Sequence, residues 1–134
     1  MIYVVIDTNV FVSALMTQNP NSATTKVVDH LAKGDIILLY NDEILSEYQS
    51  VLSRDRFHIT STRIAALINF IRQKGVAAER VSADTLFTDE SDRVFYEVAL
   101  SEEDSFLVTG NLRHFPADTR VVTPAQMLDI LAKG

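Results

Sequence analysis

The start of the chain constrains the fold most, because a short apolar run ends there at an acid. Residues 3–6 (YVVI) are apolar without alternation, Asp7 follows them, and a helical pattern begins directly behind it. An apolar run of this kind is typical of a parallel strand that is covered on both faces. Open α/β sheets bind ligands outside the carboxyl ends of their strands, where Asp7 would lie. The chain is therefore predicted to be an α/β protein with a functional site behind its first strand.

Length and composition restrict the class of protein. The 134 residues fit a single domain over 1–134, and a hydrophobic fraction of 47% is sufficient for a real core. The chain has no cysteine, which excludes disulfides and thiolate zinc sites and fits a reducing cytosol. No apolar run approaches the roughly 18 residues that span a bilayer, and Met1 leads into the first strand without a secretion signal. We expect a cytoplasmic protein with no membrane partner.

Strands and helices alternate along the chain. Alternation of this kind requires crossover connections, which favour a parallel sheet covered by helices on both faces. The strands are expected at 3–6, 36–40, 77–81, 106–108 and 120–122. The helices are expected at about 10–15, 22–33, 42–52, 61–74, 91–100 and 124–132.

Two acids have positions that suggest a site. Asp7 is the first, although an Asp-Thr-Asn run behind a strand would also serve as a helix N-cap. Thr8 and Asn9 are candidates for that capping or for contacts with a substrate. Glu47 flanks the apolar face of the helix expected at 42–52. Because an unpartnered buried carboxylate is costly, a Glu in this place indicates a function.

Acids also gather at the start of the helix expected from residue 91. Asp89, Glu90 and Asp92 lie within four residues, where negative charge and capping side chains favour a helix start. Their mutual repulsion would be relieved by a cation. Asp92 precedes Phe95 by three residues, which turns it toward the sheet. We predict Asp92 as a metal ligand, with Asp89 or Glu90 in a second or outer-sphere position.

A further polar group follows the strand expected at 106–108. Thr109 and Asn111 should emerge at the same edge as Asp7, although a Gly-Asn pair is also ordinary turn chemistry. His114 could be a general base, but its apolar neighbours favour a packed or surface histidine. Convergent oxygen ligands without a cysteine nearby suit Mg²⁺ or Mn²⁺.

Charge is distributed unevenly along a chain whose net charge is −6. Half of the 12 basic residues lie in 54–80, whereas acids dominate 84–104. An acidic pole can hold a metal while a basic arm holds a polyanion. The alternative is two ordinary solvated helix faces.

Four segments, in this order and at this spacing, resemble the motifs of PIN domains. They are residues 5–10 (VIDTNV), 45–48 (LSEY), 89–95 (DESDRVF) and 108–111 (VTGN). The similarity extends from Ile2 to about Leu131, and it is greatest to the branch of toxins from bacterial toxin–antitoxin systems. The resemblance implies a three-layer α/β/α sandwich around a mostly parallel five-stranded sheet. It also implies an Mg²⁺- or Mn²⁺-dependent ribonuclease, often a homodimer and often inhibited by a cognate antitoxin protein.

Under this resemblance, Asp7, Glu47 and Asp92 match the acidic positions of the family. Asn111 falls where many PIN domains have a further Asp, so a charge is lost while a carbonyl ligand is kept. These four residues are the predicted catalytic and metal-binding set, with Asp89 as an additional candidate. The predicted contacts with the RNA substrate are Thr8, Asn9, Thr109, Arg54, Arg56, Arg72 and Lys74.

Two other functions fit the same pattern less well. A phosphatase of the haloacid dehalogenase type would need a second Asp shortly after Asp7, and a receiver domain would need a lysine after the last strand. A binding module that has lost its metal would keep the fold and its partners without the chemistry. The sequence favours a hydrolase in which water is the nucleophile, leaving a 5′-phosphate and a 3′-hydroxyl.

Overall fold

The computed structural model describes residues 1–134 and contains one five-stranded, all-parallel sheet of order β3-β2-β1-β4-β5. The strands are β1 (Ile2–Ile6), β2 (Ile36–Tyr40), β3 (Val76–Ala77), β4 (Ser105–Val108) and β5 (Val121–Val122). This confirms the α/β fold class and the five parallel strands expected from the sequence.

The order of the strands creates a switch point between β1 and β4. The chain steps from β1 to β2 to β3 in one direction and then returns to place β4 on the other side of β1. Asp7 follows β1 directly and Thr109 follows β4 directly. Crevices at such switch points are where open α/β sheets bind ligands. The fold therefore brings these two residues to the expected location of a site.

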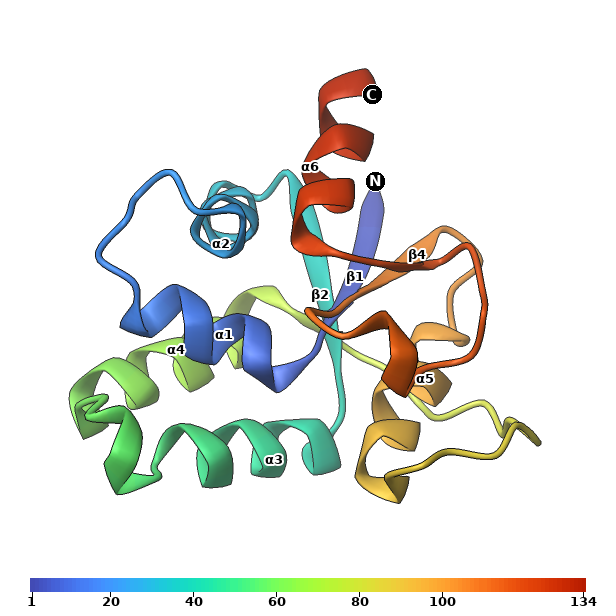
Figure 1. Cartoon of the computed structure of the whole chain (residues 1–134), viewed down its shortest axis with the longest axis horizontal. Coiled ribbons are helices and arrows are strands. Elements are labelled where there is room, and N and C mark those ends of the chain that lie inside the picture. Colours follow the sequence, from blue (N-terminus) through green and yellow to red (C-terminus); the bar gives the residue numbers. More distant parts are fainter.

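Helices cover both faces of the sheet. They are α1 (Thr8–Met16), α2 (Ala23–Lys33), α3 (Asp42–Leu52), α4 (Ser61–Lys74), α5 (Arg93–Ala99) and α6 (Pro124–Lys133). Right-handed crossovers in one direction place their helices on one face, and a returning crossover uses the other face. Figure 1 accordingly shows α1 to α4 to the left of β1 and β2, and α5 to their right. Helix α6 packs against α2 and β4.

Local signals in the sequence define most helix boundaries. Ser22 and Asn41 cap α2 and α3, and each side chain accepts the backbone N–H of the residue three positions later. Thr123 forms a capping box with Gln126 at the start of α6. Gly34 ends α2 with a φ of 84°, a conformation that favours glycine. These boundaries agree with the sequence-based expectations.

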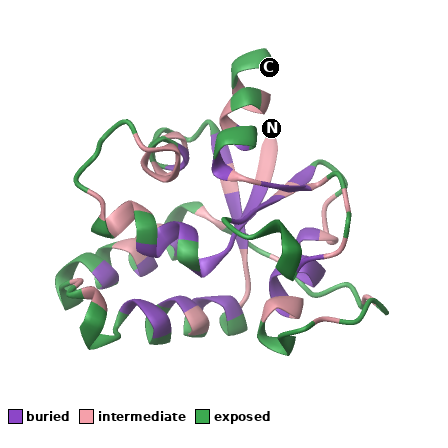
Figure 2. Cartoon of the chain, viewed as in Figure 1, coloured by how far each residue is buried: buried purple, intermediate pink, exposed green.

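The core joins the strands to the inner faces of the helices. Figure 2 shows the central strands and most of α5 as buried, while the loops and outer helix faces are exposed. Tyr48 of α3 packs edge-to-face on Phe11 of α1 and also contacts Phe95 of α5. Aromatic contacts of this kind stabilise cores beyond simple burial. They tie α1, α3 and α5 together beneath the carboxyl ends of the strands.

Three segments differ from expectation. Strand β3 covers Val76–Ala77, so only Ala77 of the strand expected at 77–81 pairs with β2, and the Val81 N–H bonds instead to the Glu97 carbonyl of α5. The helix expected over 91–100 begins as a 3₁₀ turn at Glu90–Asp92, and two further 3₁₀ turns occupy Asp55–Phe57 and Leu112–His114. None of the helices combines the length and apolar character needed to cross a membrane.

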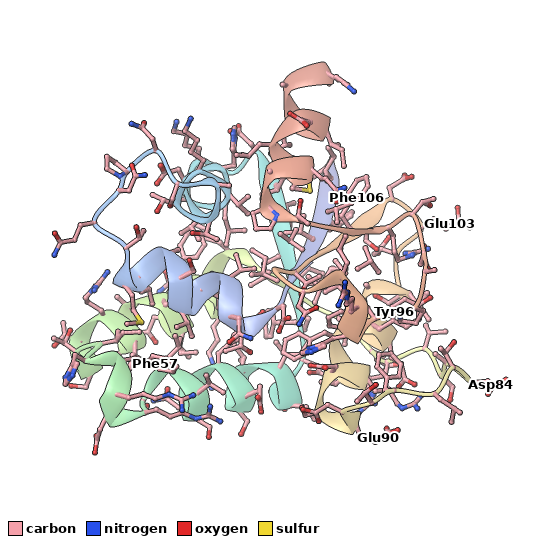
Figure 3. All side chains as sticks on the ribbon, viewed as in Figure 1. Phe57, Asp84, Glu90, Tyr96, Glu103 and Phe106 are labelled. Carbon is pink, nitrogen blue, oxygen red and sulfur yellow. The ribbon has the colours of Figure 1, made fainter.

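The acidic residues of 84–104 do not form a single pole. Figure 3 shows Asp84 on the loop that leads toward α5, Glu90 in the 3₁₀ turn just before α5, and Glu103 close to the start of β4. Glu103 lines a cavity there with Met1 and Gly134, near both chain ends. Only part of this acidic segment therefore reaches the carboxyl edge of the sheet.

Candidate functional site

Asp7 is a buried acid whose partner comes from the far end of the chain. Its side chain is buried, with 6% of the residue's surface exposed, and the Thr109 hydroxyl donates a hydrogen bond to Asp7 Oδ2 at 2.8 Å. Asp7 occupies the N-cap position of α1, but its carboxylate makes no capping bond. The capping alternative is therefore wrong.

Burial disfavours the ionised form of Asp7. It raises the pKa of this carboxyl above its usual range, although the Thr109 hydroxyl acts in the opposite direction. An ionised Asp7 is consequently disfavoured by its surroundings when no cation is near. A bound cation would remove that penalty, which makes the position suitable for a metal ligand.

Glu47 reaches the same place from α3. The Tyr48 hydroxyl donates to the Ile6 carbonyl at the end of β1, which anchors α3 below the strand. Glu47 precedes Tyr48, is half-buried and shares a pocket with Asp7. The expectation that Glu47 lies beside the apolar face of its helix is confirmed.

Asp92 is a second acid of the site whose pKa is raised. Its pKa is raised to about 6, first by burial and then by repulsion from Asp7, Asp89 and Glu47, while His114 lowers it. Only 14% of its side chain is exposed. Repulsion among these carboxylates raises the Asp92 pKa although the basic side chains of Arg54 and His114 line the same pocket.

These acids line a small polar pocket of about 220 Å³ at the carboxyl edge of the sheet. Its acidic residues are Asp7, Glu47, Asp89 and Asp92. Its other polar residues are Thr8, Asn9, Ser91, Arg54 and His114. The structure therefore brings together three of the four predicted ligands, the additional candidate Asp89 and three of the predicted substrate contacts.

The structure does not bring three of the predicted ligands close enough to hold one ion directly, so a divalent ion at this site would be bound partly through water. No three His, Asp or Glu side chains are spaced to hold one metal ion together. Mg²⁺ usually keeps several waters and binds through one or two carboxylates, so it does not require such a group. The Thr8 hydroxyl is buried, lines the pocket and has no hydrogen-bond partner. A buried hydroxyl without a protein partner beside these acids is compatible with a hydrated ion in the pocket.

Asn111 is placed differently from the predicted ligand. It is exposed, it does not line the pocket, and its Oδ1 accepts the Arg113 backbone N–H at 3.3 Å. Its Nδ2 lies 2.9 Å from His114 Nε2. The Thr109 hydroxyl accepts the Asn111 N–H while it donates to Asp7, so the turn itself is as expected.

Asp89 and Glu90 have different local partners. Asp89 Oδ1 accepts bonds from the Ser91 N–H and hydroxyl, and the residue still lines the pocket. Glu90 forms two bonds with Arg93, at 2.7 and 3.0 Å, and does not line the pocket. Of these two candidates for an outer position, only Asp89 is placed to contribute.

The predicted basic contacts are divided between the carboxyl ends and the amino ends of the parallel strands. Arg54 lines the acidic pocket, and Arg56 stacks over Phe57 near the end of α3. Arg72 and Lys74 lie in the last turn of α4, and Lys74 lines a separate cavity at the start of β2. Helix α4 leads into the amino end of β3, so its last turn lies away from the acidic pocket.

A family model described as PIN domain matches residues 3–113. This match covers most of the chain and includes Asp7, Glu47, Asp92 and Asn111. The chain belongs to the PIN domain family. PIN domains are usually nucleases and are typically metal-dependent, which agrees with the acidic pocket at the switch point. No curated protein matches this PIN domain closely enough to be compared with it.

The pocket of this PIN domain includes His114, which the sequence offered only as a less favoured general base. His114 lines the pocket and places Nδ1 3.6 Å from Asp92 Oδ2, whereas its apolar neighbours favoured a packed or surface histidine without a role in the site. Phe115 is buried, whereas His114 has half of its side chain exposed. The Asn111-to-His114 spacing of a 3₁₀ turn is the only signal that could have revealed this placement.

Proposed function

We propose that this PIN domain is a divalent-metal-dependent endoribonuclease that hydrolyses RNA phosphodiester bonds. The observation that carries the proposal is the buried Asp7, held by Thr109 at the switch point and facing three further acids in one pocket. Acids raised in pKa by burial and mutual repulsion are frequent at functional sites. Because PIN domains are usually nucleases, we propose nucleic acid as the substrate of this chemistry.

Asp7 and Asp92 would bind the ion directly, and Glu47 and Asp89 would act through bound water. When present, Mg²⁺ or Mn²⁺ activates a water molecule and neutralises charge on the phosphate. Thr109 fixes the Asp7 carboxylate so that Oδ1 is free of this hydrogen bond. Tyr48 and the aromatic core fix the position of α3, and with it Glu47.

Water is the proposed nucleophile because no side chain in the pocket is activated for attack. The chain has no cysteine, and the Ser91 hydroxyl donates to Asp89 instead of to a histidine. His114 is engaged by Asn111 and faces Asp92. Hydrolysis by water would leave a 5′-phosphate and a 3′-hydroxyl.

RNA would be held mainly through its backbone. Arg54 is the basic residue that lines the pocket, and Thr8 and Asn9 offer a hydroxyl and an amide beside Asp7. Contacts with phosphates give affinity and register but little choice of sequence. Cleavage specificity would therefore depend on the shape of the RNA more than on individual bases.

The resemblance of the four motifs to toxin components extends this proposal to the cellular role. The ribonuclease would act as the toxin of a toxin–antitoxin pair, as a homodimer in the cytoplasm. A cognate antitoxin protein would inhibit it by covering the acidic pocket. Induced expression should then arrest bacterial growth, and the Asp7→Asn variant should not.

The direct test is incubation of the purified protein with a mixed RNA pool, in Mn²⁺ or in EDTA. We expect cleavage that requires Mn²⁺, yields 5′-phosphate ends and disappears in Asp7→Asn. Cleavage of simple phosphate monoesters but not RNA would favour the phosphatase alternative. Mn²⁺-independent RNA binding without cleavage would favour a binding module and contradict the proposal.

A further inference from the structure

We infer that Asn111 is a positioning residue that acts through His114: it holds the imidazole in the tautomer that directs an Nδ1–H donor toward Asp92 and the acidic pocket. The role of that donor, a hydrogen bond to a phosphate oxygen of the substrate, rests on the proposed ribonuclease function. The tautomer itself follows from hydrogen bonding and needs no assumption about activity.

The first step is the orientation of the Asn111 amide. Its Oδ1 lies 3.3 Å from the Arg113 backbone nitrogen, which can only donate. The oxygen of the amide must therefore face Arg113, and the NH₂ group must face His114. The distance to the imidazole alone would not distinguish the amide oxygen from the amide nitrogen, and the contact with Arg113 N–H makes that distinction.

The second step is the position of the imidazole proton. Asn111 Nδ2 lies 2.9 Å from His114 Nε2, and an amide NH₂ group has no lone pair available to accept a hydrogen bond. Nε2 must therefore accept, which leaves it without a proton. A neutral imidazole carries one proton, so it lies on Nδ1.

The third step is the direction of that proton. His114 Nδ1 lies 3.6 Å from Asp92 Oδ2, an acceptor, so both ring nitrogens face partners that favour the same tautomer. The imidazole lines the acidic pocket and has 49% of its side chain exposed. An incoming phosphate could therefore reach the Nδ1–H, which is not engaged in a short hydrogen bond.

This arrangement gives a reason for Asn at residue 111, because a carboxylate there would favour the other tautomer of His114. A carboxylate at residue 111 could accept the Arg113 N–H in the same way, but its other oxygen would accept from a protonated Nε2. The lone pair of Nδ1 would then face the Asp92 carboxylate, and the pocket would lose the donor. Asn111 thus contributes to the site without lining the pocket.

The test is ¹⁵N NMR of the imidazole in metal-free, alkaline buffer, comparing the wild-type protein with Asn111→Asp and Asp92→Asn. We expect pyridine-like Nε2 and pyrrole-like Nδ1 in the wild type, the reverse in Asn111→Asp, and the wild-type pattern in Asp92→Asn. Asp at residue 111 keeps the acceptor for Arg113, so loss of the turn would not explain the reversal. A pyrrole-like Nε2 in the wild type, or a reversal in Asp92→Asn only, would overturn the inference.

A second readout addresses the use of the donor. In the active enzyme, His114→Ala should lower kcat about ten- to a hundredfold, the value of one hydrogen bond to a charged group, and leave Mn²⁺ affinity unchanged. Unchanged kcat in His114→Ala would contradict the proposed role of Nδ1–H. Because the NMR result requires no cleavage, an inactive protein and a wrong tautomer are distinguishable outcomes.

Discussion

The Thr109 hydroxyl donates a hydrogen bond to Asp7 Oδ2 at 2.8 Å across a separation of 102 residues. It joins the ends of β1 and β4, the two strands that flank the switch point of the sheet. The hydrogen bond orients the buried Asp7 carboxylate, while burial raises its pKa. The properties proposed for this PIN domain depend on that combination.

Replacement of Thr109 by Val should reduce cleavage while preserving side-chain volume. Loss of a hydrogen bond to a charged group costs about 1.5–3 kcal/mol, which corresponds to about ten- to a hundredfold in kcat/KM. Thr109→Ser keeps the hydroxyl and should retain most activity. The comparison is made by steady-state cleavage of RNA in Mn²⁺. Equal activity of the Val variant and the wild type would remove the Asp7–Thr109 bond from the mechanism.

The stability of the metal-free protein should fall as pH rises between about 4 and about 6. The pKa of Asp92 is raised on folding from 3.8 to about 6, so the folded state binds the proton more tightly than the unfolded state. Stability is therefore highest below the unfolded pKa and is lost as pH rises through the folded one, by about 3 kcal/mol. Urea unfolding at a series of pH values measures this loss.

Asp92→Asn should flatten that pH dependence, because it removes the titrating group. Asp129→Asn is the matched control, since Asp129 is exposed on α6 and forms no ion pair. Burial also raises the pKa of Asp7, which leaves a smaller slope of the same sign in Asp92→Asn. If stability depends on pH as steeply in Asp92→Asn as in the wild type, a raised Asp92 pKa is not the cause of that dependence.

Glu97→Gln should destabilise the fold through the loop before α5. The buried Glu97 accepts bonds from Arg80 Nε at 2.8 Å and from the Ala83 N–H at 2.9 Å, which hold its pKa below the usual range despite burial. A neutral amide cannot serve both donors equally, and we expect a loss of about 3 kcal/mol. Thermal unfolding and proteolysis within 79–84 measure the effect. Exposed Glu103→Gln should change neither, and a matching result for the two variants would refute the role of Glu97.

Arg54→Ala should weaken RNA binding, whereas Lys74→Ala should not. Arg54 lines the acidic pocket, while Lys74 lines a separate cavity at the start of β2. Loss of one phosphate contact should also reduce the dependence of log affinity on log salt by about 0.7 for single-stranded RNA. Binding to Asp7→Asn protein, measured at several salt concentrations, avoids cleavage. Equal losses from both substitutions would indicate nonspecific attraction.

The sequence predicts the scaffold of the site well because the relevant signals are local. An apolar run that ends at Asp7 defines a buried strand, and the apolar stripe of α3 places Glu47 at its margin. Parallel topology then brings strand ends to one edge. These inferences need only the periods of strands and helices.

The remainder depended on contacts between distant segments. Ala77–Val81 has the composition of a strand, but bonds from Val81, Arg80 and Ala83 to Glu97 redirect the chain. Arg72 and Lys74 belong to the same basic segment of the sequence as Arg54, but they lie in the last turn of α4, away from the acidic pocket. For His114, a single 3₁₀ turn decides which side chain faces the pocket. None of these outcomes is encoded in composition or periodicity.

Calorimetric titration with Mn²⁺ tests the central claim most directly, because it asks whether the acids at the switch point bind a divalent ion. We predict uptake by the wild type and by Asp129→Asn, with loss of uptake in both Asp7→Asn and Asp92→Asn. Binding by these two variants that equals the wild type, or no uptake by the wild-type protein, would contradict the account.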